Sequence, residues 1–174
     1  GFWAEATGDV ATALGAETLA SGEQAIAAGF RSEASGLAGS AYGGYSVASE
    51  MGATALGYGA EAVADFATAV GTGAWATGAS SVAVGEYSEA QGAESVAVGG
   101  TVFGFIPTQA TGEGATAMGA GAWATGDYST ANGWISSADG ANSTALGASS
   151  WAEADGTTVL GYGAYASEAN SVAL

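Results

Sequence analysis

The sequence predicts an all-β fold, a solenoid of about twelve coils with 14 residues in each coil. Glycines recur every 14 residues from Gly15 to Gly99 and again from Gly119 to Gly161. Small residues dominate, with 31 Gly among 174 residues, and there is no Cys, so no disulfide holds the fold together. A fixed period of this kind is typical of folds in which each repeat stacks on its neighbours. We number the recurring glycine as position 5 of the repeat.

Each repeat contains two short alternating stretches, at positions 1–5 and 8–12. Because side chains alternate between the faces of a strand, positions 1, 3 and 5 share one face, and so do 8, 10 and 12. These positions hold mostly Ala, Ser, Thr and Gly, so two strands per coil can close only around a narrow interior. A helix is disfavoured, since each glycine in it would cost about 1 kcal/mol relative to Ala. The alanines expected inside the roll are Ala20, Ala34, Ala48, Ala62, Ala76, Ala83, Ala90, Ala97, Ala124, Ala138, Ala152 and Ala166.

Positions 2 and 4 form an uncharged, mostly aliphatic stripe that points away from this interior. An apolar patch of several hundred Å² usually marks an interface, and no other segment of the chain is available to cover the stripe. We therefore expect rods to associate side by side, with Asn132 as a polar residue that can set their register. The predicted interface residues are Leu14, Ile26, Leu56, Val70, Val82, Val84, Val96, Val98, Met118, Leu146, Leu160, Val172 and Leu174.

Composition excludes several functions. Seventeen acids stand against one base, Arg31, which argues against binding to nucleic acid or to an anionic membrane surface. His, Cys and Lys are absent, which removes the usual general base, thiol nucleophile and Schiff-base amine. Two carboxylates suffice for glycoside hydrolysis, but no pair of acids stands out in a cleft. We expect no enzyme, no cofactor and no metal site.

Two segments carry a family resemblance. Residues 142–147 read Asn-Ser-Thr-Ala-Leu-Gly, and residues 81–85 read Ser-Val-Ala-Val-Gly, followed by Ser-Glu-Ala-Gln-Gly at 88–92. Some twelve such copies in register cover essentially the whole chain. This pattern resembles the YadA-like head repeats of trimeric autotransporter adhesins.

The resemblance implies a left-handed parallel β-roll, assembled side by side as a homotrimer with positions 2 and 4 in its core. It also implies an extracellular head at the bacterial cell surface, a role in virulence, and binding to host cells through an extracellular matrix protein or a cell-surface receptor. We expect residues 1–174 to be a single head fragment of a longer protein, anchored in the outer membrane only through C-terminal regions outside this chain.

Residues 100–107 interrupt the repeat and contain the only Pro. Insertions between repeats form loops on one face, often the binding face. Phe103, Phe105 and Ile106 could contact a partner, but we favour a loop that folds over its own rod or onto a neighbouring chain, because exposed apolar residues are unfavourable in water.

Outward-facing aromatic residues recur at position 9, namely Trp75, Trp123, Trp151 and Tyr165. Trp and Tyr are enriched at binding hot spots, yet cross-coil packing explains them equally well and is the interpretation we favour. Trp151 and Tyr165 lie in adjacent coils and are expected to stack. Acids at position 13, such as Asp9 and Glu23, could hold Ca²⁺, although a solvated acidic face is the simpler interpretation.

Two alternatives remain open besides the adhesin head. Thr54, Thr68 and other threonines at position 2 are similar to the threonine ranks of ice-binding β-solenoids, but position 4 is aliphatic here. A carbohydrate-active β-helix is the other alternative. The sequence does not identify the host ligand.

Overall fold

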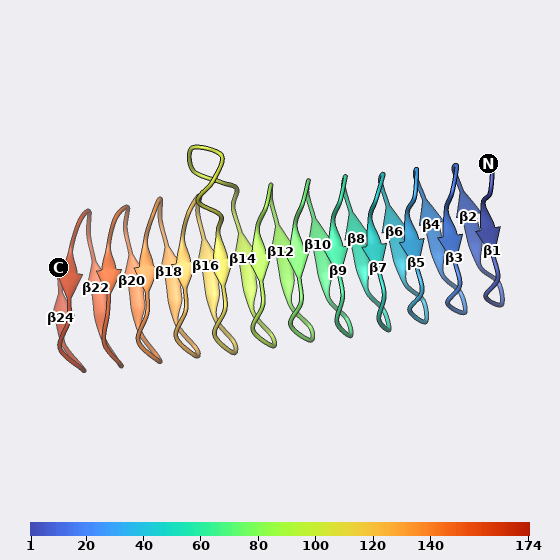
Figure 1. Ribbon diagram of the computed structural model, residues 1–174. Helices are drawn as coiled ribbons and strands as arrows, with labels where there is room; N and C mark the ends of the chain where they lie inside the picture. The colour runs from blue at the N-terminus through green and yellow to red at the C-terminus, as the bar shows by residue number, and fades with distance from the viewer.

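A computed structural model describes residues 1–174 and confirms the predicted parallel β-solenoid (Figure 1). The chain forms 24 strands in two 12-stranded sheets, and each coil contributes one strand to each sheet. No helix is long and apolar enough to cross a membrane. The odd-numbered sheet contains β1 (Glu5–Ala6), β3 (Leu19–Ala20), β5 (Glu33–Ala34), β7 (Val47–Ala48), β9 (Glu61–Ala62), β11 (Trp75–Ala76), β13 (Glu89–Ala90), β15 (Gln109–Ala110), β17 (Trp123–Ala124), β19 (Ser137–Ala138), β21 (Trp151–Ala152) and β23 (Tyr165–Ala166). The even-numbered sheet contains β2 (Thr12–Leu14), β4 (Ile26–Ala28), β6 (Ser40–Tyr42), β8 (Thr54–Leu56), β10 (Thr68–Val70), β12 (Val82–Val84), β14 (Val96–Val98), β16 (Thr116–Met118), β18 (Thr130–Asn132), β20 (Thr144–Leu146), β22 (Thr158–Leu160) and β24 (Val172–Ala173).

Identical repeat positions lie opposite one another in neighbouring coils. In the even-numbered sheet, for example, Ala69 pairs with Ala83, one repeat later. The register survives the insertion, because Glu89 pairs with Gln109 and Val96 pairs with Thr116. The strands are shorter than the alternating stretches in the sequence, with three residues at positions 2–4 and two at positions 9–10.

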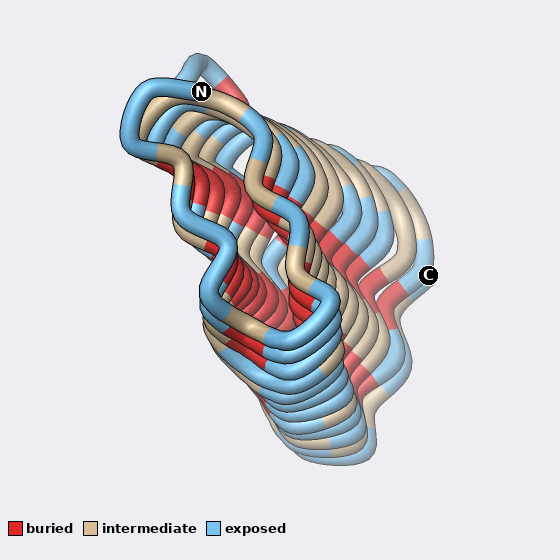
Figure 2. Tube along the Cα trace, turned by 90° about the vertical axis from the view of Figure 1, so that its right-hand side faces the viewer, coloured by how far each residue is buried: buried red, intermediate tan, exposed pale blue.

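The interior between the two sheets is a thin column of alanine methyl groups. Figure 2 shows the buried residues of successive coils lined up along the rod. The alanines at positions 3 and 10 that the sequence assigns to the interior are fully buried, apart from Ala166, which is 7% exposed. Val159 is the largest side chain with no exposed surface. The core therefore contains almost nothing bulkier than Ala, Ser or Thr.

Glycine at position 5 allows the coils to approach closely. At Gly71, whose φ is +133°, an added Cβ would lie 2.5 Å from the carbonyl oxygen of Gly85 in the next coil. Both the backbone conformation and the space thus exclude a side chain there. This glycine ends the even-numbered strand and turns the chain toward the other sheet.

The corners of each coil use the left-handed backbone region at positions 7 and 14, which sequence reasoning missed. Non-glycine residues occupy it repeatedly, as at Gln24 (φ 59°) and Tyr45 (φ 60°). Each such residue costs about 1–2 kcal/mol of backbone strain. The strain is offset by hydrogen bonds between coils: the Gln24 N–H donates to the carbonyl of Asp9 at 2.7 Å, and the Tyr45 N–H donates to that of Phe30 at 2.8 Å.

Two glycine substitutions separate the effect of close approach from that of backbone strain. Gly71→Ala should lower the free energy of unfolding by about 3 kcal/mol or more, because it adds a steric clash to the strain. Gly59→Ala is the matched control, since Gly59 has φ +61° and open space around it, and should cost only about 1–2 kcal/mol. Thermal and denaturant unfolding measure both. Equal losses would contradict the close-packing account.

Candidate functional site

The even-numbered sheet presents the aliphatic stripe on its outward face. All thirteen predicted interface residues lie along this sheet, and none of them is buried within the single chain. Their exposure ranges from half-buried, as at Val84, to 88% at Leu174 at the C-terminal end. In-register pairing places Val84 beside Val98 and Val98 beside Met118, so the apolar surface is continuous from coil to coil.

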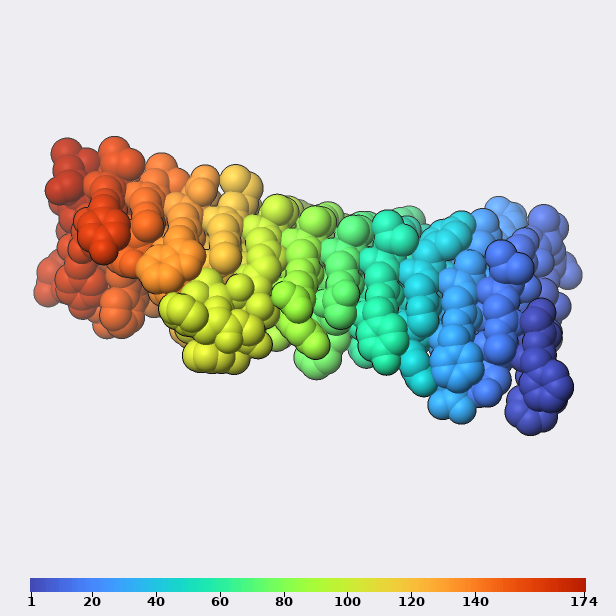
Figure 3. Space-filling view, turned by 90° about the horizontal axis from the view of Figure 1, so that it is seen from above, coloured from blue at the N-terminus to red at the C-terminus, as the bar shows by residue number.

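The insertion forms a loop that protrudes from the rod between β14 and β16 (Figures 1 and 3). Val102 and Ile106 pair as an antiparallel bridge, and Val102 is only 5% exposed. Both side chains pack over Gly121, where an added Cβ would meet them at 2.9 and 3.3 Å. The loop therefore lies against its own rod on one side.

The tip of the loop is exposed in the single chain, and the expected packing of its apolar residues onto a neighbouring chain stays a prediction. Phe103 and Phe105 are 75% and 73% exposed, on either side of Gly104 in a tight turn. Their rings stack at a centroid distance of 6.3 Å. Of the three residues singled out in the sequence, Ile106 packs over Gly121 of the rod, and Phe105 lines a small pocket with Tyr87 and Glu89.

The aromatic row at position 9 lies on the outward face of the odd-numbered sheet. Trp123, Ser137, Trp151 and Tyr165 follow one another in register. Trp151 and Tyr165 contact each other across adjacent coils in an edge-to-face arrangement, with an interplanar angle of 73° and centroids 5.7 Å apart. Trp75 stands apart, between Glu61 and Glu89.

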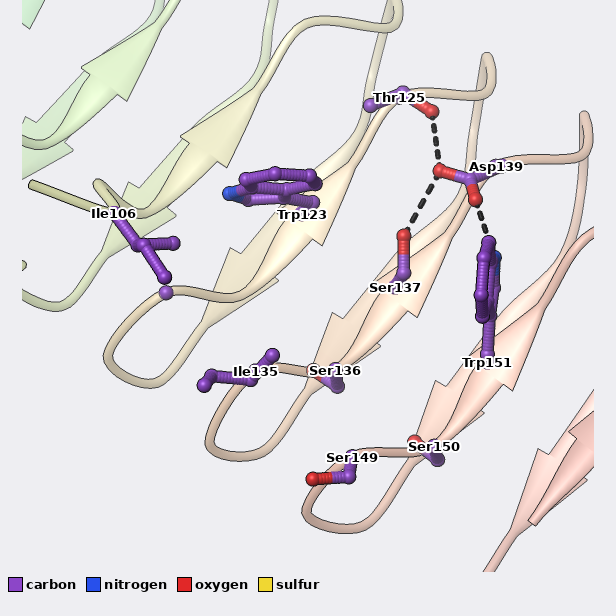
Figure 4. Close-up of a pocket in the computed structure, with 11 residues that line it drawn as sticks. Ile106, Trp123, Thr125, Ile135, Ser136, Ser137, Asp139, Ser149, Ser150 and Trp151 are labelled. Atoms are coloured by element: carbon purple, nitrogen blue, oxygen red, sulfur yellow. Dashed lines mark hydrogen bonds between the residues drawn. The ribbon is translucent and has the colours of Figure 1, made fainter. Parts of the chain in front are cut away.

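A groove of about 530 Å³ opens in this row, next to the loop (Figure 4). Trp123 and Trp151 stand on either side of Ser137, and Ile106 from the loop and Ile135 from a turn add apolar walls. The Trp123 indole N–H donates to the carbonyl of Pro107 at 2.9 Å, which ties the loop to this wall. The insertion thus contributes directly to the shape of the groove.

Asp139 is the only charged residue that lines the groove. Its Oδ1 accepts hydrogen bonds from Thr125 Oγ1 at 2.8 Å and from Ser137 Oγ at 2.9 Å. Its Oδ2 accepts one from the Trp151 indole N–H. Three donors therefore fix the carboxylate and one of the tryptophan walls in position.

Several other acids accept hydrogen bonds from the backbone or from side chains. Asp127 and Asp155 at position 13 accept the N–H groups of Glu113 and Ala141 in the preceding coil, at 3.0 and 2.8 Å. These bonds give the acidic row a structural role. No cluster of three metal-ligating side chains occurs along the chain. The single base, Arg31, pairs with Glu17 at 2.6 Å.

Two tyrosines donate hydrogen bonds to carboxylates at the surface. The Tyr128 hydroxyl donates to Glu113 at 2.7 Å, and the Tyr165 hydroxyl donates to Glu153. The hydrogen bond to Glu113 and its negative charge raise the pKa of Tyr128 above the ordinary value near 10. The hydrogen bond to Glu153 raises the pKa of Tyr165 in the same way.

Alkaline titration tests these contacts. A raised tyrosine pKa stabilises the folded chain below about pH 10, and this contribution is lost as the pH rises through the folded-state pKa. Glu113→Gln should lower the titration midpoint of Tyr128, because the negative charge is removed. Ultraviolet absorbance of the phenolate measures the midpoint, with Tyr128→Phe identifying the Tyr128 component. An unchanged midpoint in Glu113→Gln would contradict the assignment.

The groove itself was not found by sequence reasoning, although Trp123, Trp151 and Ile106 were named as separate candidates. Asp139, Thr125 and Ile135 were missed. The available signal was a small residue, Ser137, between two tryptophans at the same repeat position. The sequence did not predict the path of the loop, which brings Ile106 beside the two tryptophans.

Comparison with known families matches the chain to the YadA head domain repeat (2 copies), over residues 6–32, 20–49, 48–74, 76–100, 110–134, 138–164 and 152–174. The matched segments follow the coils and skip most of the inserted loop. A search of curated proteins found no match. The family match extends over most of the solenoid, and the chain therefore belongs to the YadA head repeat family.

Proposed function

We propose that this chain is the adhesive head of a trimeric autotransporter, displayed at the bacterial surface and binding a host matrix protein or cell-surface receptor without catalysis. The observation that carries the proposal is the aliphatic stripe, which runs along the rod in a chain of the YadA head family. An adhesin-type role is the one that this family implies.

The stripe supports assembly through the even-numbered sheet. Its neighbouring coils place aliphatic side chains such as Val84 and Val98 beside one another, so a second rod can cover them in a continuous contact. No Asp or Glu occurs at positions 2 and 4. Side-by-side contact therefore brings apolar surface together without placing like charges directly in the seam, despite the net charge of −16.

Assembly would leave the other face available for adhesion. The odd-numbered sheet lies across the narrow interior from the stripe, and it carries the tryptophans, the tyrosine and the groove. The loop tip adds two exposed phenylalanines beside that face. Three copies of a binding surface on one head increase retention, because each further contact forms at a high effective concentration.

The proposal predicts that assembly and adhesion are lost together in a stripe variant. Wild type should have three times the 16.5 kDa chain mass by light scattering and should be retained on immobilised collagen, fibronectin, laminin or cultured epithelial cells. Val98→Glu places a charge in the stripe and should give monomers, with retention at least about tenfold weaker because multivalency is lost.

Thr77→Glu is the matched control, since it adds the same charge to the outward face of the odd-numbered sheet, where Thr77 is exposed. It should remain trimeric. A monomeric wild type would refute the assembly, and a trimer that no matrix protein or cell surface retains would refute the adhesive role.

A further inference from the structure

We propose that the groove between Trp123 and Trp151 binds an arginine side chain of the partner protein. This deepens the proposed adhesive function and rests on it, because it names the chemistry that the odd-numbered face recognises. The volume of about 530 Å³ falls within the range of sites that hold small ligand groups.

The width of the groove suits one side chain. Trp123 and Trp151 are two coils apart in the register of the odd-numbered sheet, with Ser137 between them. Coils stack about 4.8 Å apart, which separates the two tryptophan backbones by roughly 9.6 Å. Ser137 is small and lies between the two tryptophans (Figure 4), so the groove that these residues line has room for a side chain above it.

The walls and the floor together select a planar cation. A guanidinium stacks flat on aromatic faces and still has N–H groups free to donate to a carboxylate, a combination that an ammonium group offers less well. Asp139 already accepts three hydrogen bonds, and a carboxylate offers about four such sites, so one remains for a ligand. The existing bonds hold the carboxylate in place before a ligand arrives.

A second carboxylate next to Asp139 strengthens the preference for a cation. Asp139 and Glu153 occupy the same repeat position in adjacent coils, on the same outward face. Like charges directly opposite one another across strands are destabilising. The single base of the chain, Arg31, is paired with Glu17 in another part of the rod, so no positive charge of the same chain lies beside this pair.

Nuclear magnetic resonance of the five tryptophan indole N–H groups in the intact assembly tests the proposal. The probe is N-acetyl-arginine N-methylamide, and its control is the citrulline analogue, which has the same shape without the charge. At constant ionic strength, arginine should shift the Trp123 and Trp151 resonances saturably, in the millimolar range of a single side chain. Citrulline should leave them unmoved, and Trp75 should not respond to either.

Two variants complete the test. Asp139→Asn keeps the side-chain size and should weaken arginine binding about tenfold. Ser137→Leu fills the groove from its floor and should abolish arginine binding. This second variant tests the proposal even if Asp139→Asn fails to fold. Equal shifts with the citrulline analogue would overturn the proposal, and so would the absence of a shift with any probe. N-acetylglucosamine serves as a third probe, and shifts of the two indole resonances with this sugar but not with arginine would also overturn the proposal. Because the probe is a small molecule, such a result leaves the separately measured adhesion of the head unaffected.

Discussion

The close stacking of coils around a column of methyl groups is the constraint on which the rest of the structure depends. Ala76 and its counterparts from Ala20 to Ala152 have no exposed surface, and the position 5 glycines from Gly15 to Gly147 have no room for a side chain. A roll this narrow cannot contain a leucine or a phenylalanine in its regular coils. Every bulky or charged residue of the chain must therefore point outward or sit in a turn or loop.

This constraint divides the outward surface into two faces with different chemistry. The even-numbered sheet carries aliphatic residues and no acid at positions 2 and 4, whereas the odd-numbered sheet carries tryptophans together with carboxylates such as Glu89 and Asp139. In a monomer built this way, the aliphatic residues that would form the core of an ordinary domain lie at the surface. In the proposed assembly, other copies would bury that surface, which is how a fold without a bulky core can still gain hydrophobic stabilisation.

Most of the fold could be predicted from the repeat, because a fixed period of 14 residues specifies register directly. Alternation then separated inward from outward positions, as the burial of Ala83 between Val82 and Val84 illustrates. The left-handed corners were not predicted, since residues as different as Arg31, Phe66 and Ile135 occupy them. Their conformation is imposed by hydrogen bonds between coils and not by local preference.

The candidate site was only partly predictable for a related reason. The position 9 tryptophans follow from the period, but the groove depends on where a non-repeating loop lands, and Ile106 reaches Gly121 and Ile135 only in three dimensions. The hydrogen bonds that fix Asp139 likewise join three different coils. The 14-residue period predicts the features that recur in every coil, whereas this site forms where the inserted loop interrupts the repeat.

The thermal midpoint of Ala76→Leu, compared with that of Thr77→Leu, tests the central claim most directly. The two residues are adjacent in the chain, but Ala76 has no exposed surface and Thr77 points into solvent. If the narrow interior dictates the structure, Ala76→Leu should lower the midpoint by roughly 5–10 °C through overpacking. Thr77→Leu should change it by no more than about 2 °C. Equal midpoints for the two variants would show that the interior has room to spare and would contradict the account.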